Sequence, residues 1–207
     1  MNISILKQVL KDAWRGFKLN YLSSRRDRYG YIHPTATVLQ PCCCNKVNTY
    51  LYEHTNLSEN TRIINSKGKF ILKKYSAAAI NLTVICQNHK FFEVGTYPGS
   101  PIWGHTDTTA EDVIVDEHVW IGANVTLCPG THIGRGCMVA AGAVCVKSKK
   151  YPPYTVIGGN PAKVIKYRFT LEEQIEHEKL IYPVEERLDP KFLKEIYEET
   201  NNLIHKK

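Results

Sequence analysis

The feature of this sequence that most restricts its fold is an apolar side chain at every sixth position between residues 115 and 145. Six consecutive positions in this frame are apolar: Val115, Ile121, Leu127, Ile133, Val139 and Cys145. Apolar residues make up 43% of the chain, so chance gives such a run with a probability of about 0.04 after a choice among six frames. Neither the strand period of two nor the helix period of 3.6 explains a period of six.

A second set of residues, two positions before the first, is also apolar or small. It consists of Val113, Val119, Val125, Thr131, Cys137 and Ala143. We interpret each hexad as a short strand and a corner, so that three hexads, about 18 residues, close one triangular turn. One aliphatic side chain per hexad then points inward, and successive turns pair as parallel strands. Small residues such as Gly122 and Gly134 fit the tight corners, where a larger side chain would clash.

The same register continues upstream with short insertions. The runs there are Leu72, Ala78 and Val84, then Leu51, Leu57 and Ile63, then Ile32 and Val38. Between residues 89 and 112 the pattern stops, and a long loop that interrupts a solenoid is usually functional. We therefore expect a mainly β chain: a helical segment over 1–30, a coiled β domain over 31–166 with one excursion loop at about 89–112, and a helical extension over 167–207. Thr170 and Glu173 form a capping-box signal for a helix in that extension.

Residues 3–22 have helical spacing, with an apolar stripe that includes Trp14 and a basic opposite face. Two interpretations stay open: a terminal helix packed on the body, or a basic amphipathic helix in peripheral contact with anionic lipid at the inner face of the membrane. The N-terminus has charges inside its apolar stretch, so it does not resemble a secretory signal, and no run of 18 or more apolar residues is present. We expect a cytoplasmic protein.

The net charge of +7 suits an anionic partner such as a phosphorylated cofactor, and nucleic-acid binding has only this charge in its favour. We interpret the seven cysteines, including the triplet Cys42, Cys43 and Cys44, as reduced residues of a cytoplasmic protein. A metal site is not expected, because no CxxC pair occurs. The separation of His118 and His132 along the chain does not match one turn of three hexads, so these two rings are not expected to stack on one face.

Four stretches resemble one known family in their order along the chain. They are KGKFILKKYSAAAINLTVICQNH at 67–89, GTYP at 95–98, DVIVDEHVWIGANVTLCPGTHIGRGCMVAAGAVCVKS at 112–148, and PPYTVIGGNPAKVIKYRF at 152–169. This combination resembles the hexapeptide-repeat acyltransferases, and within them the xenobiotic and polysaccharide O-acetyltransferase branch. The resemblance implies a left-handed parallel β-helix, a homotrimer with its active sites between subunits, and transfer of an acetyl group from acetyl-CoA.

Acetyl transfer from a thioester to a hydroxyl requires a base, and histidine is suited because its pKa lies near neutral pH. His89 ends the QNH stretch and opens the irregular loop, and in the similar enzymes the histidine at this position is the catalytic base. His105 is the second candidate. His118 and His132 fall inside ordinary hexads at outward positions.

The donor is expected along the outside of the coils, where backbone groups bind an extended arm and neighbouring side chains need to be small. Ala123, Ala141 and Gly142 meet that need, and Ala123 and Ala141 occupy equivalent positions on successive turns. The resemblance implies acetyl-CoA contacts at Ala123, Ala141, Val146 and Lys147. It also assigns the nucleotide phosphates to basic side chains after GGNP, namely Lys163, Lys166 and Arg168, although a solvated basic tail is the alternative.

The acceptor pocket is expected in the excursion loop, where Tyr97 and Trp103, with Phe91, could stack on a sugar or a drug ring. The alternative is that these aromatic residues only cover the coil. The leading hypothesis is O-acetylation of a sugar or polysaccharide precursor. An antibiotic hydroxyl of the streptogramin or chloramphenicol kind, a serine or other small acceptor, and a non-catalytic scaffold remain as alternatives.

Overall fold

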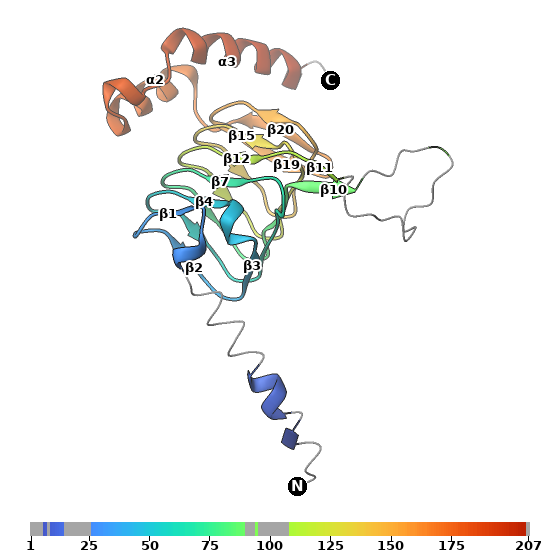
Figure 1. The fold of residues 1–207 in the computed structure, drawn as a ribbon. Coiled ribbons are helices and arrows are strands. Elements are labelled where there is room, and N and C mark those ends of the chain that lie inside the picture. The colour runs from blue at the N-terminus through green and yellow to red at the C-terminus, as the bar shows by residue number, and fades with distance from the viewer. Residues whose placement is uncertain (1–5, 8, 15–25, 90–93, 95–107, 206–207) are drawn as a thin grey trace.

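The chain winds into a three-sided prism, seen in the computed structural model (Figure 1). The structure describes residues 6–7, 9–14, 26–89, 94 and 108–205. Face A holds β1 (Tyr31–Ile32), β4 (Thr49–Leu51), β7 (Phe70–Leu72), β12 (Val113–Val115), β15 (His132–Ile133) and β18 (Lys150–Tyr151). Face B holds β2 (Thr37–Val38), β5 (Asn56–Leu57), β8 (Ala77–Ala78), β13 (Trp120–Ile121), β16 (Met138–Val139), β19 (Thr155–Gly159) and β20 (Ala162–Tyr167). Face C holds β3 (Cys42–Cys44), β6 (Thr61–Ile64), β9 (Thr83–Ile85), β14 (Thr126–Leu127) and β17 (Val144–Cys145).

Strand pairing confirms the predicted turn length. Ile114 of β12 pairs with His132 of β15, which pairs with Lys150 of β18, so each of these steps spans three hexads. Upstream, Tyr31 pairs with Tyr50 and Tyr50 with Ile71, so those turns are slightly longer than three hexads. The short insertions expected from the shifted frames therefore lie between turns that still stack in parallel.

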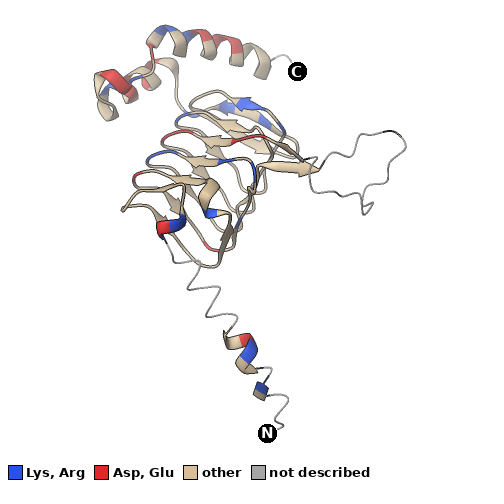
Figure 2. Cartoon of the chain, viewed as in Figure 1, with Lys and Arg blue, Asp and Glu red and all other residues tan. Residues whose placement is uncertain are grey.

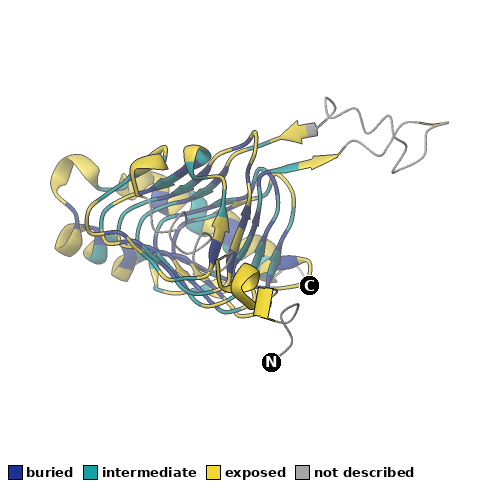
Figure 3. Cartoon of the chain, turned by 60° about the horizontal axis from the view of Figure 1, so that its bottom comes forward, coloured by how far each residue is buried: buried dark blue, intermediate teal, exposed yellow. Residues whose placement is uncertain are grey.

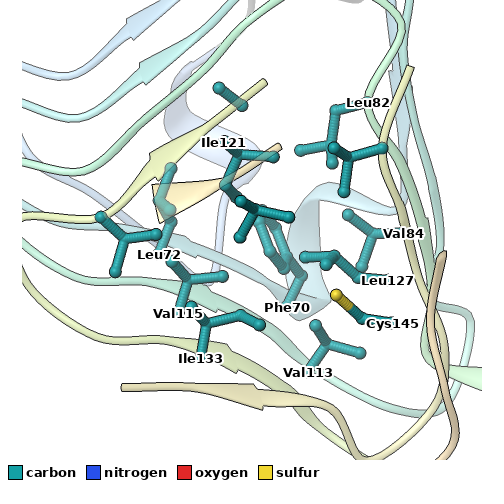
Figure 4. Close-up of a cluster of buried hydrophobic side chains, with 14 of the residues drawn as sticks. Phe70, Leu72, Leu82, Val84, Val113, Val115, Ile121, Leu127, Ile133 and Cys145 are labelled. Atoms are coloured by element: carbon teal, nitrogen blue, oxygen red, sulfur yellow. The ribbon is translucent and has the colours of Figure 1, made fainter. Parts of the chain in front are cut away.

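The predicted inward positions form the core. All six residues of the main frame are at most 1% exposed, as are their upstream counterparts Leu51, Leu57, Leu72, Ala78 and Val84. Ile63 is 4% exposed, whereas Ile32 and Val38 of the first turn are only partly buried against the core. The second set, from Val113 to Ala143, is at most 2% exposed. Figure 4 shows core side chains meeting inside the prism, with Phe70 and Leu72 from face A, Ile121 from face B and Leu127 from face C. At about 25 cal/mol per Å² of apolar surface, these stacked rows are the main source of stability.

The corners differ from the expectation of small residues. Each turn passes through a left-handed backbone position, and polar or aromatic residues occupy most of them: His54, Asn60, Tyr75, Asn81, His118, Asn124, Ser148 and Tyr154. Glycine is required where the next turn approaches closely. A Cβ on Gly122 would lie 2.6 Å from the backbone nitrogen of Ala141, and one on Gly134 would lie 2.7 Å from the carbonyl oxygen of Tyr151. Coil geometry, rather than side-chain size alone, therefore selects the corner residues.

Helices close the C-terminal end of the prism (Figure 1). They are α2 (Leu171–Ile181), the short η3 (Val184–Glu186) and α3 (Pro190–His205); two further short helices, η1 (Arg26–Arg28) and η2 (Lys46–Asn48), lie upstream. The predicted capping box is present: the Thr170 hydroxyl accepts from the Glu173 N–H at 3.2 Å, and Glu173 accepts from the Thr170 N–H at 2.8 Å. The helical extension is therefore confirmed.

Residues 6–7 and 9–14 are helical, and the described part of this helix is exposed, including Val9, Leu10 and Trp14 at 57%, 59% and 67%. These apolar side chains are therefore not covered by the prism. No helix within the described residues is both long and apolar enough to cross a membrane. Lipid contact by this segment stays a prediction.

Candidate functional site

His89 lies on a two-stranded ribbon that leaves the prism between faces C and A. The ribbon, here called the arm, consists of β10 (Gln87–His89) and β11 (Thr108–Ala110), which pair antiparallel with His89 opposite Thr108. Figure 1 and Figure 3 show the arm projecting from the side of the prism, and His89 is exposed. A solvent-accessible imidazole on a fixed strand is able to exchange a proton with a bound hydroxyl.

Ala123, Ala141 and Gly142 share the corner between faces B and C. The Gly142 N–H donates to the Ala123 carbonyl at 2.9 Å, so this corner stacks from turn to turn as predicted. Gly142 has a φ of +72°, and a Cβ there would meet no atom within 4 Å. The corner therefore presents backbone and small side chains to the outside, which suits an extended amide-bearing ligand.

Val146 and Lys147 lie on the opposite edge of face C, directly after β17. Lys147 forms an ion pair with Glu111, whose Oε1 lies 3.0 Å from its Nζ. Glu111 follows β11, so Lys147 touches the root of the arm. The residues that the resemblance assigned to acetyl-CoA thus border face C on both sides, with β14 and β17 between them.

The three basic residues predicted for the phosphates spread along one strand. β20 returns antiparallel to β19, which places Lys163 opposite Gly158 near the B–C corner and Lys166 opposite Val156. Arg168 lies beyond the strand at the A–B corner, where it donates to the Gly136 carbonyl at 3.3 Å and covers the Phe169 ring. Figure 2 shows the basic residues of β20 in blue at the C-terminal end of the prism. Lys163 and Lys166 have no carboxylate within ion-pair distance in the described part of the chain.

The remaining candidates are three aromatic residues of the excursion loop and three other histidines. The predicted acceptor residues Tyr97 and Trp103, with Phe91 and His105, lie outside the described residues. His132 points outward from face A and its Nε2 lies 2.8 Å from Asp116. His118 occupies a left-handed corner position against the ring of His177, with centroids 5.6 Å apart.

A groove of about 1210 Å³ lies between α3 and the last turn of the prism, formed by β18, β19 and β20. Its lining includes Phe192, Ile196 and Leu203 from α3 and Lys150 and Lys163 opposite them. His89 is not among the lining residues. This hollow is therefore separate from the arm that carries the imidazole.

All seven cysteines lie in the described residues and all are free thiols. Burial raises the pKa of Cys137 to about 11 and that of Cys145 to about 12, so both are neutral fillers at neutral pH. Within the described residues no group of three or more potential ligands could hold a metal ion.

Comparisons with known proteins agree with this fold. Residues 112–147 match the family model described as bacterial transferase hexapeptide, six repeats. Residues 112–147 therefore consist of hexapeptide repeats, and the left-handed parallel β-helix implied by the resemblance is the fold of the chain.

Among curated proteins, the chain is 39% identical over 119 residues to a "Probable macrolide acetyltransferase" of Lysinibacillus sphaericus, covering 52% of this chain and 64% of that protein. It is 42% identical over 64 residues to a chloramphenicol acetyltransferase of Escherichia coli, covering 31% and 30%. It is 50% identical over 54 residues to a candidate lipopolysaccharide biosynthesis O-acetyl transferase of Escherichia coli K12, covering 26% of each chain. The chain thus spans less than two thirds of the length of these relatives.

Two solved structures share the fold. A hexapeptide-repeat acetyltransferase from Vibrio cholerae, complexed with acetyl coenzyme A, aligns with a TM-score of 0.59 at 20% identity over 70% of this chain and 74% of that one. A maltose O-acetyltransferase from Clostridium difficile 630 aligns with a TM-score of 0.60 at 24% identity, over 70% and 73%. At these identities the likeness concerns the fold alone.

Proposed function

We propose that this protein is an acetyltransferase that moves the acetyl group of acetyl-CoA to a hydroxyl, with His89 as general base. The observation that carries the proposal is an exposed imidazole on an arm fixed beside a hexapeptide-repeat prism. The acetyltransferase relatives, and a structure of the same fold complexed with acetyl coenzyme A, support the choice of donor.

In the proposed step, the acceptor oxygen attacks the thioester carbonyl carbon while His89 removes the hydroxyl proton. The tetrahedral intermediate collapses, the carbon–sulfur bond breaks, and the CoA sulfur leaves with a proton returned from the imidazolium. The products are an acetyl ester and CoA, and the imidazole is neutral again. A base of this kind contributes about a hundred- to ten-thousand-fold in rate.

The donor is proposed to lie on face C between the small-residue corner and the arm. Ala123, Ala141 and Gly142 would accept the pantetheine arm through backbone groups, since Gly142 has open space around it. Val146 and Lys147 would border the arm side of the same surface, and Lys163 and Lys166 supply positive charge for the phosphates.

The acceptor is proposed to be a hydroxyl of a sugar or polysaccharide precursor, supported by the 50% identity to the lipopolysaccharide O-acetyl transferase candidate. A macrolide or chloramphenicol hydroxyl is the second candidate. It is supported by the alignment with the macrolide relative, which extends over 119 residues of this chain. Both acceptors require the same base and donor, so the chemistry does not depend on the choice.

A homotrimer is proposed as the assembly. On face B, the outward side chains of Trp120 and Met138 are register neighbours, yet 49% and 38% exposed. Adjacent exposed apolar side chains of this size favour a subunit contact. Trp120→Arg combined with Met138→Glu is expected to convert a trimer to monomers in analytical ultracentrifugation, and an unchanged mass would exclude this surface.

The experiment that tests the function is release of CoA thiol from acetyl-CoA with a panel of sugars, a macrolide and chloramphenicol. His89→Ala is expected to lower kcat at least 100-fold with KM for acetyl-CoA little changed. His54→Asn is the matched control, because it removes an exposed ring at a corner of the prism and asparagine tolerates the left-handed backbone there. Full activity of His89→Ala with any acceptor would refute the assigned base.

A further inference from the structure

We infer that Glu111 is a positioning residue that, together with Gln87, fixes the root of the arm and thereby aims the imidazole of His89. The inference rests on the proposed role of His89 as the base. Glu111 and Gln87 lie outside the six-residue repeats, so the repeat pattern gives them no role in the core.

The Glu111 carboxylate ties the returning strand of the arm to a later turn of the prism. Its Oε2 accepts a 2.5 Å hydrogen bond from the Ser148 hydroxyl, and its Oε1 lies 3.0 Å from the Lys147 ammonium. Both partners follow β17, one turn beyond β14. Gly130, at the corner of the turn between, has a φ of +72°, and a Cβ there would overlap the carboxylate. This glycine is therefore what admits the Glu111 side chain.

Gln87 ties the departing strand to an earlier turn. Its Oε1 accepts from the Ser66 hydroxyl at 2.6 Å and from the Lys67 N–H at 2.9 Å. These residues precede β7, on the opposite side of the arm root from Lys147. The arm is thus held from turns on both sides.

The side chains of Gln87 and Glu111 project from opposite surfaces of the two-stranded arm. Gln87 lies directly opposite Ala110, and His89 directly opposite Thr108. Side chains alternate along a strand, so Gln87 and His89 share one surface, while Glu111, one residue after Ala110, leaves the other. Restraints on both surfaces resist bending of the arm in either direction.

The backbone at the root is also fixed. The Glu111 N–H donates to the Cys86 carbonyl at 3.0 Å, and Asp112 accepts from the Lys69 N–H at 2.8 Å. Gly68 fits against this junction, where a Cβ would lie 2.5 Å from the Cys86 carbonyl oxygen. A two-stranded ribbon alone is marginally stable in water, so its direction depends on this root.

The position of the base matters because a displacement of about 1 Å costs about a hundred-fold in rate. The Ser148 hydrogen bond and the Lys147 ammonium lower the pKa of Glu111, so the carboxylate is charged at neutral pH. The Lys147 side chain is 56% exposed and that of Glu111 33%, and such pairs contribute little to global stability. Loss of Glu111 is therefore expected to change the arm while the prism keeps its fold.

Variants of Lys147 distinguish positioning of the arm from binding of the donor, because the family resemblance assigns Lys147 a contact with acetyl-CoA. If it acts through Glu111, Lys147→Met and Glu111→Ala lower kcat alike, and the double variant is no worse than either single one. If it acts on acetyl-CoA, Lys147→Met raises KM for acetyl-CoA and Glu111→Ala does not.

The test compares Glu111→Ala, Glu111→Gln, Gln87→Ala, Lys147→Met and His89→Ala in the CoA-release assay, with hydrogen exchange at the amides of β10 and β11. Glu176→Ala is the control, since Glu176 is an exposed carboxylate 3.5 Å from Lys179 on α2. Glu111→Ala is expected to lower kcat roughly 10- to 100-fold with KM for acetyl-CoA within about two-fold, and to speed exchange in the arm. Glu111→Gln, which keeps an acceptor for Ser148, is expected to lose less.

The outcomes separate this inference from the proposed function. If His89→Ala is inactive but Glu111→Ala matches the control in kcat and in exchange, the base stands and the positioning role is overturned. If His89→Ala is fully active, the assigned base is wrong, and the exchange data alone then decide whether Glu111 fixes the arm. A rise in KM for acetyl-CoA with unchanged kcat in Glu111→Ala would also overturn the positioning role.

Discussion

The hydroxyl of Tyr154 donates a 2.6 Å hydrogen bond to the carboxylate of Glu178, joining the last turn of the prism to α2. Glu178 is 2% exposed, and its other oxygen accepts from Arg135 and from the Leu188 N–H, both at 2.9 Å. Since a buried carboxylate is tolerated only when it is paired and hydrogen-bonded, these contacts lock the helical extension onto the prism.

Tyr154→Phe is expected to destabilise the protein by about 1.5–3 kcal/mol, because it removes a hydrogen bond to a charged, buried group. Tyr75→Phe is the control, since Tyr75 occupies the equivalent corner of an earlier turn and is 51% exposed. Denaturant unfolding measures both. Equal midpoints for the two variants would show that the Tyr154 hydroxyl does not hold α2.

His118 of the prism and His177 of α2 pack against each other, and this pair predicts a loss of stability in mild acid. Burial lowers the pKa of His118, with a further lowering by His177, Arg168 and Arg135 against an opposing effect of Glu178. Burial also lowers the pKa of His177, with Arg168 adding to it and Glu178 opposing it. Tyr75, Tyr154, Phe169 and Tyr182 complete the ring contacts.

The unfolded chain, with a histidine pKa of about 6.5, binds more protons than the folded one in the window below that value. Stability is therefore complete above about pH 6.5 and falls as the pH drops toward the lower folded pKa values. The melting temperature of the wild type is expected to decline between pH 7.5 and 5.5, and that of His118→Asn/His177→Gln to decline less. Asparagine suits the left-handed position of His118. Identical slopes would exclude these histidines as the cause.

The prism was predictable from the sequence because the pattern that specifies its core recurs within every six-residue unit. Each hexad places one side chain inward, and the positions that this repeat selects, such as Leu127 and Cys145, are buried in the structure. The corners were less predictable, because the left-handed backbone at His54, Tyr75 and Tyr154 follows from coil closure and not from any propensity of those residues.

The site was predictable only in part. His89 followed from a motif resemblance, and its place on an arm from the break in the repeat. The contacts that fix the arm were missed, because Ser66 and Gln87 are 21 residues apart and Glu111 and Ser148 are 37 apart, and neither separation is a multiple of the six-residue repeat. Pairs at such separations have no periodic signal, and only the stacking of turns of unequal length brings them together.

Gly136 and Gly142 both have left-handed backbones, but only Gly136 is packed closely against another side chain. A Cβ on Gly136 would lie 2.5 Å from the Tyr154 ring, while one on Gly142 would meet nothing within 4 Å. Gly136→Ala is expected to cost about 2–5 kcal/mol, the sum of backbone strain and overpacking, and Gly142→Ala about 1–2 kcal/mol from strain alone. Thermal unfolding compares them, and similar losses would contradict the packing role of Gly136.

The basic residues on β20 and directly after it are expected to contribute unequally to the binding of acetyl-CoA. Lys163 and Lys166 project from the strand without a carboxylate partner in the described chain, whereas Arg168 is held by the Gly136 carbonyl and the Phe169 ring. Lys163→Met is therefore expected to raise KM for acetyl-CoA roughly 10- to 100-fold, the value of a charge-assisted hydrogen bond, and Lys166→Met to act in the same direction. Arg168→Met is expected to lower the melting temperature with less change in KM.

Dephospho-CoA as a competitive inhibitor supplies the control for that prediction, because it lacks the 3′-phosphate but keeps the rest of the molecule. If a lysine binds that phosphate, its variant loses affinity for CoA but not for dephospho-CoA. If both ligands weaken equally, the lysine acts on the diphosphate, or through the field of the whole strand. If neither weakens in any of the three variants, β20 is a solvated basic strand, and the nucleotide binds elsewhere along face C.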